Sequence, residues 1–352
     1  ICFFMIKQFQ EQLRRKKIGM ALFLNSSLHK QDPNIFYFTG VEVEFCILGI
    51  PSKGRPFLLV AGFEYERVRK DSRVRVVAIK KGKLFDQLRS YCKGIRKVGV
   101  NHTMISLSEH KMFRKELRKK FIDISRECMD ARSVKTKEEI KIIEKSCSIA
   151  QKILKKMLKG FKKFKSELEV AEFLEAETRK NGCSLAFPPI VASGKHAGMP
   201  HYMPGKGKIL KGFCVIDFGV KYRGYCSDIT RTVYVGKPSQ AEKEIYEEVL
   251  DVQKKSVKMC MGGGSISGVF DYALNVLGKR FPHGLGHGIG VEIHEWPNLK
   301  PGGKEKFLDG MVFTVEPGVY TKKYGIRIED DVLIEKGKSV ILTKLSKELI
   351  IV

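Results

Sequence analysis

The sequence has 352 residues, of which 43% are hydrophobic, and carries a formal net charge of +26 at pH 7. This hydrophobic content is typical of a globular protein and argues against a disordered chain. A chain of this length usually divides into two domains. Its longest apolar runs are far shorter than the ~20 residues of a membrane helix, so we expect no membrane partner.

The high positive charge is compatible with two interpretations. A basic patch is typical of nucleic-acid binding. The basic residues here are dispersed, however, with one denser patch at Lys155–Lys165 and no accompanying nucleic-acid motif. A lysine-rich solvated surface is the simpler interpretation because net charge says little about function by itself. We therefore expect no nucleic-acid partner.

The nine cysteines indicate the compartment. Their number is odd and no pair forms a CxxC motif, which favours a reduced, cytoplasmic location. The apolar start Ile1–Ile6 has no basic residues before it and no small-residue cleavage pattern after it. We therefore expect no signal peptide.

Residues 1–128 alternate short apolar strands with amphipathic helices, which predicts an α/β domain with a mixed sheet. The histidines of this half are isolated, so nothing in it suggests chemistry. The expected strands are Met20–Asn25, Phe45–Ile50, Phe57–Ala61, Val74–Ile79 and Val98–Val100, and the expected helices are Leu84–Lys97 and Leu107–Lys120.

Residues 129–352 are predicted to form an α+β domain in which helices cover antiparallel strands. Three helices are expected to begin at Ser/Thr-x-x-Glu capping boxes. These boxes start at Thr136, Ser166 and Ser239. A fourth helix is expected at Gly268–Lys279.

A predicted hairpin brings two aspartates together. Phe213–Val220 and Tyr225–Val235 are expected to be its strands, joined by residues 221–224. Counting back from a Val220–Tyr225 pair places Asp217 opposite Asp228, with Cβ atoms ~5 Å apart. Carboxylates this close repel each other unless a cation lies between them.

A second hairpin repeats the pattern near the C-terminus. Met311–Tyr320 and Gly325–Ile334 are the expected strands, and pairing Tyr320 with Gly325 places Glu316 opposite Glu329. The similar distance of both acidic pairs from their turns, three residues in one and four in the other, suggests a pseudo-twofold arrangement. Their apolar neighbours indicate burial, and buried carboxylates need partners. The two hairpins therefore predict a metal site.

Histidines are available as nitrogen ligands. His283, His287 and His294 lie in a segment broken by glycines, which opposes the helix of an HExxH zinc site. Two more, His196 and His201, lie in a glycine- and proline-rich loop. We expect all five near the carboxylates, but the pattern alone does not select the ligand.

The donor set indicates the kind of metal. An oxygen-rich site with one imidazole suits Mn²⁺, Co²⁺, Fe²⁺ or Zn²⁺. Four carboxylates are more than one divalent ion needs, so two carboxylate-bridged ions are expected. Such a pair can activate water for hydrolysis.

The order Asp, Asp, His, Glu, Glu resembles the pita-bread metallopeptidases of family M24, and within them the Xaa-Pro aminopeptidases and prolidases. The resemblance implies a pita-bread (creatinase/aminopeptidase-like) catalytic domain behind a creatinase-like N-terminal α/β domain. It is carried by Asp32–Gly40, Phe187–Gly194, Ile216–Gly219, Ser227–Thr232, Gly284–Gly288, Val315–Tyr320 and Gly325–Asp331.

The resemblance also implies residue roles. The implied metal ligands are Asp217, Asp228, His287, Glu316 and Glu329. A bridging hydroxide would attack the carbonyl carbon before proline, with Glu316 in proton transfer. His201 and His294 would hold the substrate carbonyl and the developing oxyanion. His283 and Arg327 would support them, with Arg327 neutralising carboxylate charge.

The expected activity is removal of an N-terminal residue before proline, as in an Xaa-Pro aminopeptidase, by a homodimer with manganese as the first choice of metal. An Xaa-Pro dipeptidase, or prolidase, with the same metal centre is the alternative. Methionine aminopeptidase activity is disfavoured because those enzymes usually lack such an N-terminal domain. A non-catalytic basic binding protein is a remote alternative, because it predicts degraded ligands and these are intact.

Overall fold

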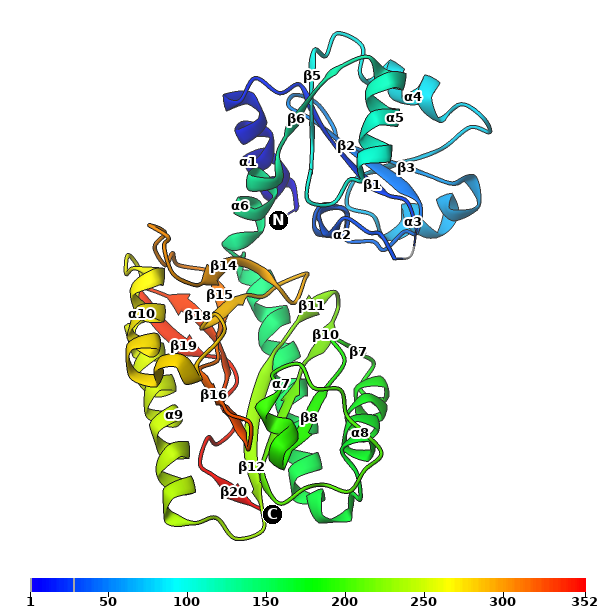
Figure 1. The fold of residues 1–352 in the computed structure, drawn as a ribbon. Helices are drawn as coiled ribbons and strands as arrows, with labels where there is room; N and C mark the ends of the chain where they lie inside the picture. The colour runs from blue at the N-terminus through cyan, green and yellow to red at the C-terminus, as the bar shows by residue number, and fades with distance from the viewer. Residues whose placement is uncertain (1, 28) are drawn as a thin grey trace. The chain divides into compact units, whose positions relative to one another are not determined.

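The computed structural model describes residues 2–27 and 29–352, and the chain divides between Arg132 and Ser133 into two compact units. The division lies within the helix Ser125–Ser133, which spans the boundary expected after residue 128. Figure 1 labels most helices and strands of both units. Within the part of the chain that the structure describes, every helix is too short or too polar to cross a lipid bilayer.

The first unit is built on a six-stranded mixed sheet, ordered β4-β3-β2-β1-β5-β6, which confirms the predicted α/β class. Its strands are β1 (Met20–Asn25), β2 (Cys46–Pro51), β3 (Phe57–Val60), β4 (Arg75–Ala78), β5 (Lys97–Val100) and β6 (Lys120–Asp123). Its helices are α1 (Cys2–Arg15), α2 (Pro33–Thr39), η1 (Gly62–Glu64), α3 (Tyr65–Asp71), α4 (Leu84–Tyr91), α5 (Leu107–Leu117) and α6 (Ser125–Ser133).

Two helix ends in this unit differ from the prediction. Helix α4 ends at Tyr91 rather than at Lys97, which is instead the first residue of β5. Helix α5 ends before Arg118, which adopts a left-handed conformation with φ of 51°, and Lys120 begins β6. That edge strand was missed because it contains only two consecutive apolar residues.

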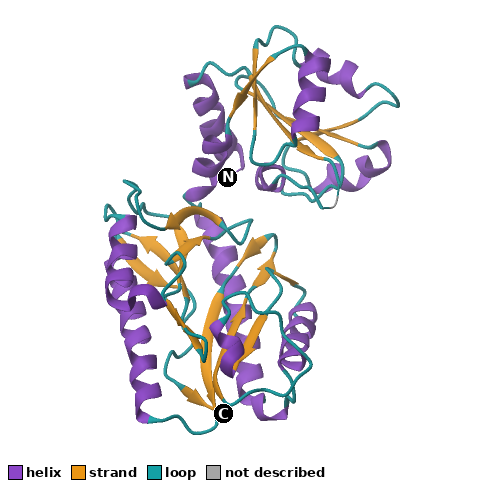
Figure 2. Cartoon of the chain, viewed as in Figure 1, coloured by secondary structure: helices purple, strands orange, loops and turns teal. Residues whose placement is uncertain are grey.

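Helices cover largely antiparallel sheets in the second unit (Figure 2), with α7 and α8 packed on one group of strands and α9 and α10 on another. Its helices are α7 (Lys137–Lys159), η2 (Phe161–Lys163), α8 (Glu167–Lys180), η3 (Gly194–Gly198), α9 (Gln240–Met259), α10 (Ile266–Leu277) and η4 (Gly278–Arg280). Helices α7, α8 and α9 start directly after Thr136, Ser166 and Ser239, as predicted.

Four sheets form the interior of this unit, in the orders β20-β12-β9-β8, β14-β13-β15-β18-β19, β11-β10-β7 and β16-β17. The strands of the first half are β7 (Ser184–Leu185), β8 (Ile190–Ser193), β9 (Gly212–Phe218), β10 (Val220–Tyr222), β11 (Tyr225–Cys226) and β12 (Ile229–Val235). Those of the second half are β13 (Gly286–Gly288), β14 (Glu295–Leu299), β15 (Val312–Val315), β16 (Gly318–Tyr320), β17 (Gly325–Arg327), β18 (Asp330–Glu335), β19 (Lys338–Ile341) and β20 (Ile350–Ile351).

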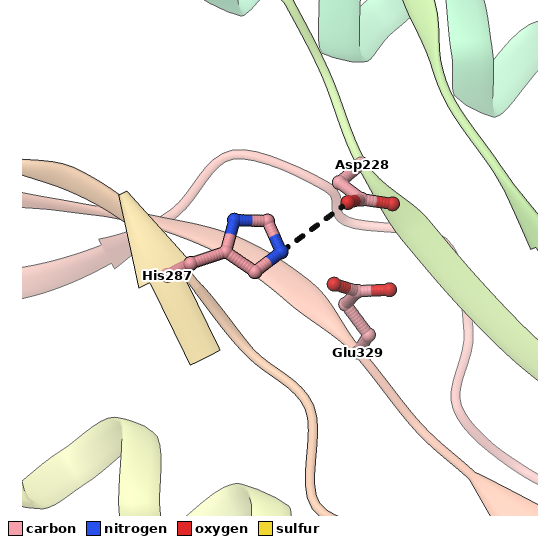
Figure 3. A group of neighbouring side chains, drawn as sticks. All are labelled: Asp228, His287 and Glu329. Atoms are coloured by element: carbon pink, nitrogen blue, oxygen red, sulfur yellow. Dashed lines mark ion pairs between the residues drawn. The ribbon is translucent and has the colours of Figure 1, made fainter. Parts of the chain in front are cut away.

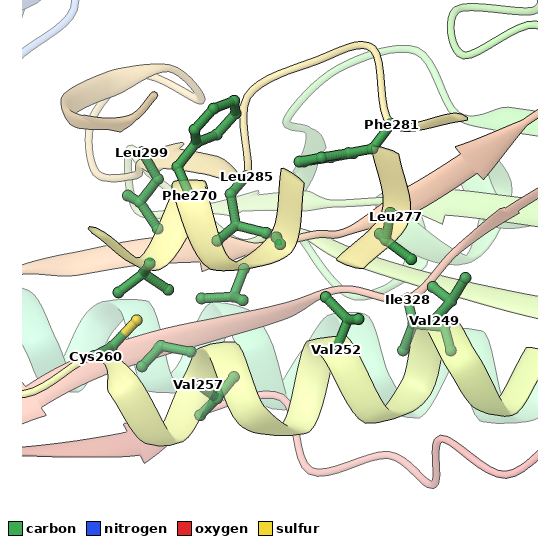
Figure 4. Packing of buried hydrophobic residues seen from close by; sticks show 14 of the residues in the cluster. Val249, Val252, Val257, Cys260, Phe270, Leu277, Phe281, Leu285, Leu299 and Ile328 are labelled. Carbon is green, nitrogen blue, oxygen red and sulfur yellow. The ribbon is translucent and has the colours of Figure 1, made fainter. Parts of the chain in front are cut away.

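Apolar side chains fix the helices against these sheets. Val249 and Val252 of α9 and Phe270 and Leu277 of α10 belong to one buried cluster, which continues onto strands such as β14 through Leu299 (Figure 4). A separate cluster joins α7 and α8 to β8, β9 and β12. Both clusters therefore fix the sheets in place. Side chains on such rigid strands can form a precise polar site.

The predicted register of the first hairpin is wrong by two residues. Its turn is only Arg223-Gly224, with φ of 47° and 80°, so Tyr222 pairs with Tyr225. Asp217 consequently lies opposite Thr230 rather than Asp228. Two residues with positive φ match a tight type I′ turn. The sequence did not indicate this turn, because Arg223 stands where Asn or Asp is usual. A shift of two residues keeps every side chain on its original face.

The predicted register of the second hairpin is confirmed. Tyr320 pairs with Gly325, and Val315 pairs with Asp330. Each expected strand is interrupted, so Glu316 and Glu329 lie facing each other in the gap between the two ladders. Freed from ladder pairing, this backbone can point both carboxylates into one cleft.

Candidate metal centre

Three of the expected ligands converge in the second unit from three different segments. Asp228 precedes β12, His287 lies in β13, and Glu329 lies between β17 and β18. One ligand atom from each of these residues lies within 4.8 Å of the others (Figure 3). This is the spacing that a shared cation would require.

The other two expected ligands lie in the same cleft. Glu316 Oε1 lies 3.4 Å from His287 Nε2, and Asp228 Oδ2 lies 3.8 Å from the same nitrogen. Asp217, on β9, lines the cleft as well. The structure thus brings all five residues together, although strand counting had misjudged the register of one pair.

Burial and mutual repulsion raise the pKa values of three of these carboxyl groups. The pKa of Asp228 lies well above its usual range, first because of desolvation and then because of Glu329 and Asp217. The pKa values of Glu316 and Glu329 are raised by the same causes, with desolvation the largest. Without a cation here, the mutual repulsion of these carboxylates would destabilise the folded protein.

Several carboxylate oxygens in the cleft have no hydrogen-bond donor among the described residues. They are Asp217 Oδ1, Asp228 Oδ1 and Glu329 Oε1. Buried oxygens of this kind are normally satisfied. Their convergence with an imidazole nitrogen is the donor set of a first-row divalent metal, so these residues fit the group that the sequence predicts.

Hydrogen bonds fix the orientation of the ligand side chains. His287 Nδ1 lies 3.2 Å from the carbonyl oxygen of Gly288, which, with Nδ1 as donor, leaves the lone pair of Nε2 facing the carboxylates. Thr230 Oγ1 donates to Glu329 Oε2 at 2.6 Å. Thr314 Oγ1 donates to Glu316 Oε1 at 3.2 Å. These contacts preorganise the site.

Asp331 supports the centre and was missed by sequence reasoning. Its Oδ2 accepts from the backbone nitrogen of Asp228 at 2.9 Å and from Cys147 Sγ at 3.2 Å. Burial, partly opposed by these hydrogen bonds, raises the pKa of Asp331 to about 8. The only available signal was its position two residues after Glu329 on the same face of the chain.

Arg327 supplies the positive charge closest to the carboxylates. Its Nη1 donates to Tyr320 Oη at 2.7 Å, and its Nε donates to Thr230 Oγ1 at 3.3 Å. Tyr320 Oη lies 3.0 Å from His283 Nε2, so the guanidinium, the phenol and this imidazole form one chain.

The centre lies in a cleft of about 540 Å³, which His201, His283 and His294 also line. The rings of His287 and His294 are 4.3 Å apart. Burial lowers the pKa of His294, and likewise that of His283, which favours neutral imidazoles. The prediction that His196 lies beside the other histidines in the cleft is wrong. Its Nδ1 lies 3.0 Å from Glu167 Oε1, and His196 does not line the cleft.

The glycines around His287 permit close backbone packing. A Cβ at Gly286 would overlap the carbonyl oxygen of Thr314, and one at Gly288 would overlap that of Trp296. Only glycine allows β13 to lie this close to its neighbours. The glycine-rich pattern in the sequence therefore serves strand packing around the histidine.

Comparison with known proteins assigns a family to both units. Residues 141–336 match the family model described as Metallopeptidase family M24, and residues 5–134 match the Creatinase/Prolidase N-terminal domain. An Xaa-Pro dipeptidase of Pyrococcus horikoshii is 36% identical over 335 residues, covering 93% of this chain and 95% of the relative.

Solved structures agree. An Xaa-Pro dipeptidase from Bacillus anthracis superposes with a TM-score of 0.91 at 31% identity, covering 100% of both chains. An X-Pro aminopeptidase from Thermotoga maritima gives a TM-score of 0.89 at 30% identity, covering 97% of this chain and 100% of that one. The chain belongs to metallopeptidase family M24, with a creatinase/prolidase-type domain preceding its peptidase domain.

Proposed function

We propose that this chain is an Xaa-Pro dipeptidase, and that Asp217, Asp228, His287, Glu316 and Glu329 hold two divalent metal ions. The observation that carries the proposal is the set of buried carboxylate oxygens without a donor, gathered around His287. The proline-directed substrate is supported by the relatives, since the dipeptidase of Pyrococcus horikoshii aligns along nearly the whole chain.

Charge balance supports two ions rather than one. The four carboxylates carry four negative charges when ionised, and Arg327 cancels one of them. One divalent ion would leave the cleft negative, whereas two would leave a single positive charge. A slightly positive site suits a substrate carbonyl oxygen that becomes negative during hydrolysis.

The bound ions would polarise the scissile carbonyl and activate water. His201 and His294 line the cleft beside them and would donate to the substrate carbonyl and to the developing oxyanion. Glu316, whose Oε1 lies 3.4 Å from His287 Nε2, would take up and return a proton. His283 would hold Tyr320 and, through it, Arg327.

The cleft wall suits a small substrate that ends in a carboxylate. Its apolar lining includes Phe187, Pro188 and Ile293, against which a proline ring can pack. Lys300 is exposed at the end of β14, lines the same cleft and makes no ion pair within the described ranges. We place the carboxylate of an Xaa-Pro dipeptide on Lys300, because a free terminal carboxylate needs a cation when it enters a partly buried site.

Two substrates test the choice of dipeptidase. With Mn²⁺ added, we expect hydrolysis of an Xaa-Pro dipeptide and little hydrolysis of the Xaa-Pro-Xaa tripeptide. Lys300→Met should raise KM for the dipeptide about tenfold, equivalent to ~1.4 kcal/mol, with little change in kcat. Lys304→Met, an exposed lysine outside the cleft lining, is the matched control.

The Xaa-Pro aminopeptidase that the sequence placed first remains the second candidate, supported by the likeness to the enzyme from Thermotoga maritima. Efficient cleavage of the tripeptide together with a silent Lys300→Met substitution would favour it over the dipeptidase. The same assay therefore decides between them.

The remaining parts of the proposal rest on the donor set and the resemblance. Manganese is our first choice, and cobalt, zinc and iron fit the same oxygen and nitrogen ligands. A homodimer is proposed from the family resemblance. A cytoplasmic location is supported by the eight cysteines from Cys46 to Cys260, all of which are free thiols.

A further inference from the structure

The loop that carries His201 runs from Gly194 to Gly205, between β8 and β9. It places His201 and Met203 in the cleft lining. Among the described residues, no hydrogen bond or ion pair holds the ring of His201. The direction in which this ring points is therefore set by the backbone of the loop.

One buried carboxylate outside the cleft connects to this loop at three points. The side chain of Glu167, at the start of α8, is 1% exposed. Its Oε1 accepts from the Ser193 backbone nitrogen and from Ser193 Oγ, both at 2.7 Å, and lies 3.0 Å from His196 Nδ1. The third point is Tyr202: desolvation and then its interaction with the same carboxylate raise the pKa of the Tyr202 phenol.

These points lie on both sides of His201 in the chain. Ser193 and His196 precede it, and Tyr202 follows it directly. The rings of His196 and Tyr202 stack with centroids 4.5 Å apart and an interplanar angle of 15°, which closes the loop on itself. Desolvation raises the pKa of Glu167, but hydrogen bonds from Ser193 and His196, with a smaller contribution from Tyr202, outweigh it and lower the pKa, so the carboxylate stays ionised.

The opposite face of the loop rests on the hairpin that carries Arg327. A Cβ at Gly198 would overlap the carbonyl oxygen of Thr321, and a Cβ at Gly325 would overlap that of Ala197. Arg327 Nη1 also donates to the carbonyl oxygen of Pro200 at 3.5 Å. The loop is thus held between a rigid hairpin and the Glu167 carboxylate.

We infer that Glu167 is a positioning residue that acts through the His196–Tyr202 pair to aim His201 at the substrate. This inference rests on the proposed function for the role of His201, although the anchoring of the loop does not. A buried carboxylate is costly unless its hydrogen bonds are satisfied. Ser193 belongs to β8, but His196 and Tyr202 reach Glu167 only when the loop is closed, so the closed geometry is the one that Glu167 stabilises.

Single substitutions should separate positioning from folding. Glu167→Ala should lower kcat about 10- to 100-fold for an Xaa-Pro dipeptide, with KM within about twofold, since misplacing a group by an ångström can cost this much. His196→Phe keeps the stacking and removes one hydrogen bond, so a smaller loss is expected. Glu167→Gln keeps an acceptor oxygen and should recover most of the rate. Glu172→Gln, on the exposed face of α8, is the control.

A double-mutant cycle supplies the decisive readout. If Glu167 acts through His201, then Glu167→Ala should change kcat by less than twofold in a His201→Ala background. An equal loss in both backgrounds would overturn the inference, because Glu167 would then act on folding or on another group. A kcat for Glu167→Ala within twofold of that of Glu172→Gln would also overturn it.

Hydrogen exchange tests the anchoring without any activity. Peptides covering residues 193–205 should exchange faster in Glu167→Ala than in wild type, while those covering β13 remain unchanged. Unchanged exchange in the loop would overturn the inference. If the wild-type protein hydrolysed no Xaa-Pro peptide, the proposed function would fail, yet this exchange measurement would still judge the anchoring.

Discussion

Arg327 Nη2 donates to Asp217 Oδ2 at 2.6 Å, and the two side chains are only 4% and 13% exposed. This ion pair lies at the edge of a cluster of four carboxylates. It neutralises one of them, and the proposed metal ions would balance the remaining three.

Replacing Arg327 should therefore have a metal-dependent cost. Arg327→Met leaves Asp217 without its cation, and breaking a buried pair in this way costs about 3–5 kcal/mol. Bound Mn²⁺ would compensate part of this loss. We expect the reduction in the free energy of unfolding to be larger in chelator than in saturating Mn²⁺. Equal losses under both conditions would place Asp217 outside the metal site, and exposed Arg179→Met serves as the control.

Metal removal should lower stability even where activity is not measured. Ions that bind only the folded state stabilise it by about 2.7 kcal/mol at a concentration 100 times Kd. We expect Mn²⁺ to raise the melting temperature of the wild-type protein and to raise that of His287→Ala much less. His102→Ala, in the first unit, should respond as the wild type does. An unchanged response in His287→Ala would remove His287 from the ligand set.

Lys135 and Glu295 form a second buried ion pair, with Nζ 3.2 Å from Oε2 and side chains 1% and 3% exposed. Lys135→Met should reduce the free energy of unfolding by about 3–5 kcal/mol, because it removes a buried cationic partner of the Glu295 carboxylate. Adding Glu295→Gln should recover part of this loss. Urea unfolding measures both variants, with exposed Lys137→Met as control. If the double variant were no more stable than the single one, the loss would not come from breaking the Lys135–Glu295 pair.

Asp32 provides a pH test in the first unit. It accepts from the Asn34 backbone nitrogen at 2.9 Å, but desolvation dominates and raises its pKa from 3.8 to about 6. A raised carboxyl pKa contributes stability that is present below about pH 4 and lost as the pH rises through about 6. The shift corresponds to at most ~3 kcal/mol.

Asp32→Asn should abolish that dependence. We expect the difference in free energy of unfolding between variant and wild type to move in favour of the variant as the pH rises from 4 to 7. Urea unfolding followed by circular dichroism measures this difference. A difference that does not change with pH would contradict the raised pKa.

The starts of helices α7, α8 and α9 and the second hairpin were predictable because local chemistry specified them. Thr136 and Glu139 make the reciprocal hydrogen bonds of a capping box, and helix α7 begins at Lys137, directly after Thr136. Tyr320 pairs with Gly325 as counted. In both cases the signal is contained within a few neighbouring residues.

The first hairpin and the supporting contacts were not predictable in the same way. Register depends on the turn, and Arg223 gave no sign of the positive φ that it adopts. Asp217 and Asp228 still meet because an error of two residues preserves the face of a strand. Contacts such as Asp331 with Cys147 join residues far apart in sequence, so only the fold reveals them.

The reconstitution of chelator-treated protein with Mn²⁺ tests the central claim most directly. Hydrolysis of an Xaa-Pro dipeptide should be absent without metal, return as Mn²⁺ is added, and remain absent in Asp228→Ala and His287→Ala variants that are still folded. Hydrolysis that persists in the chelated protein, or that none of manganese, cobalt, zinc or iron restores, would contradict the proposal.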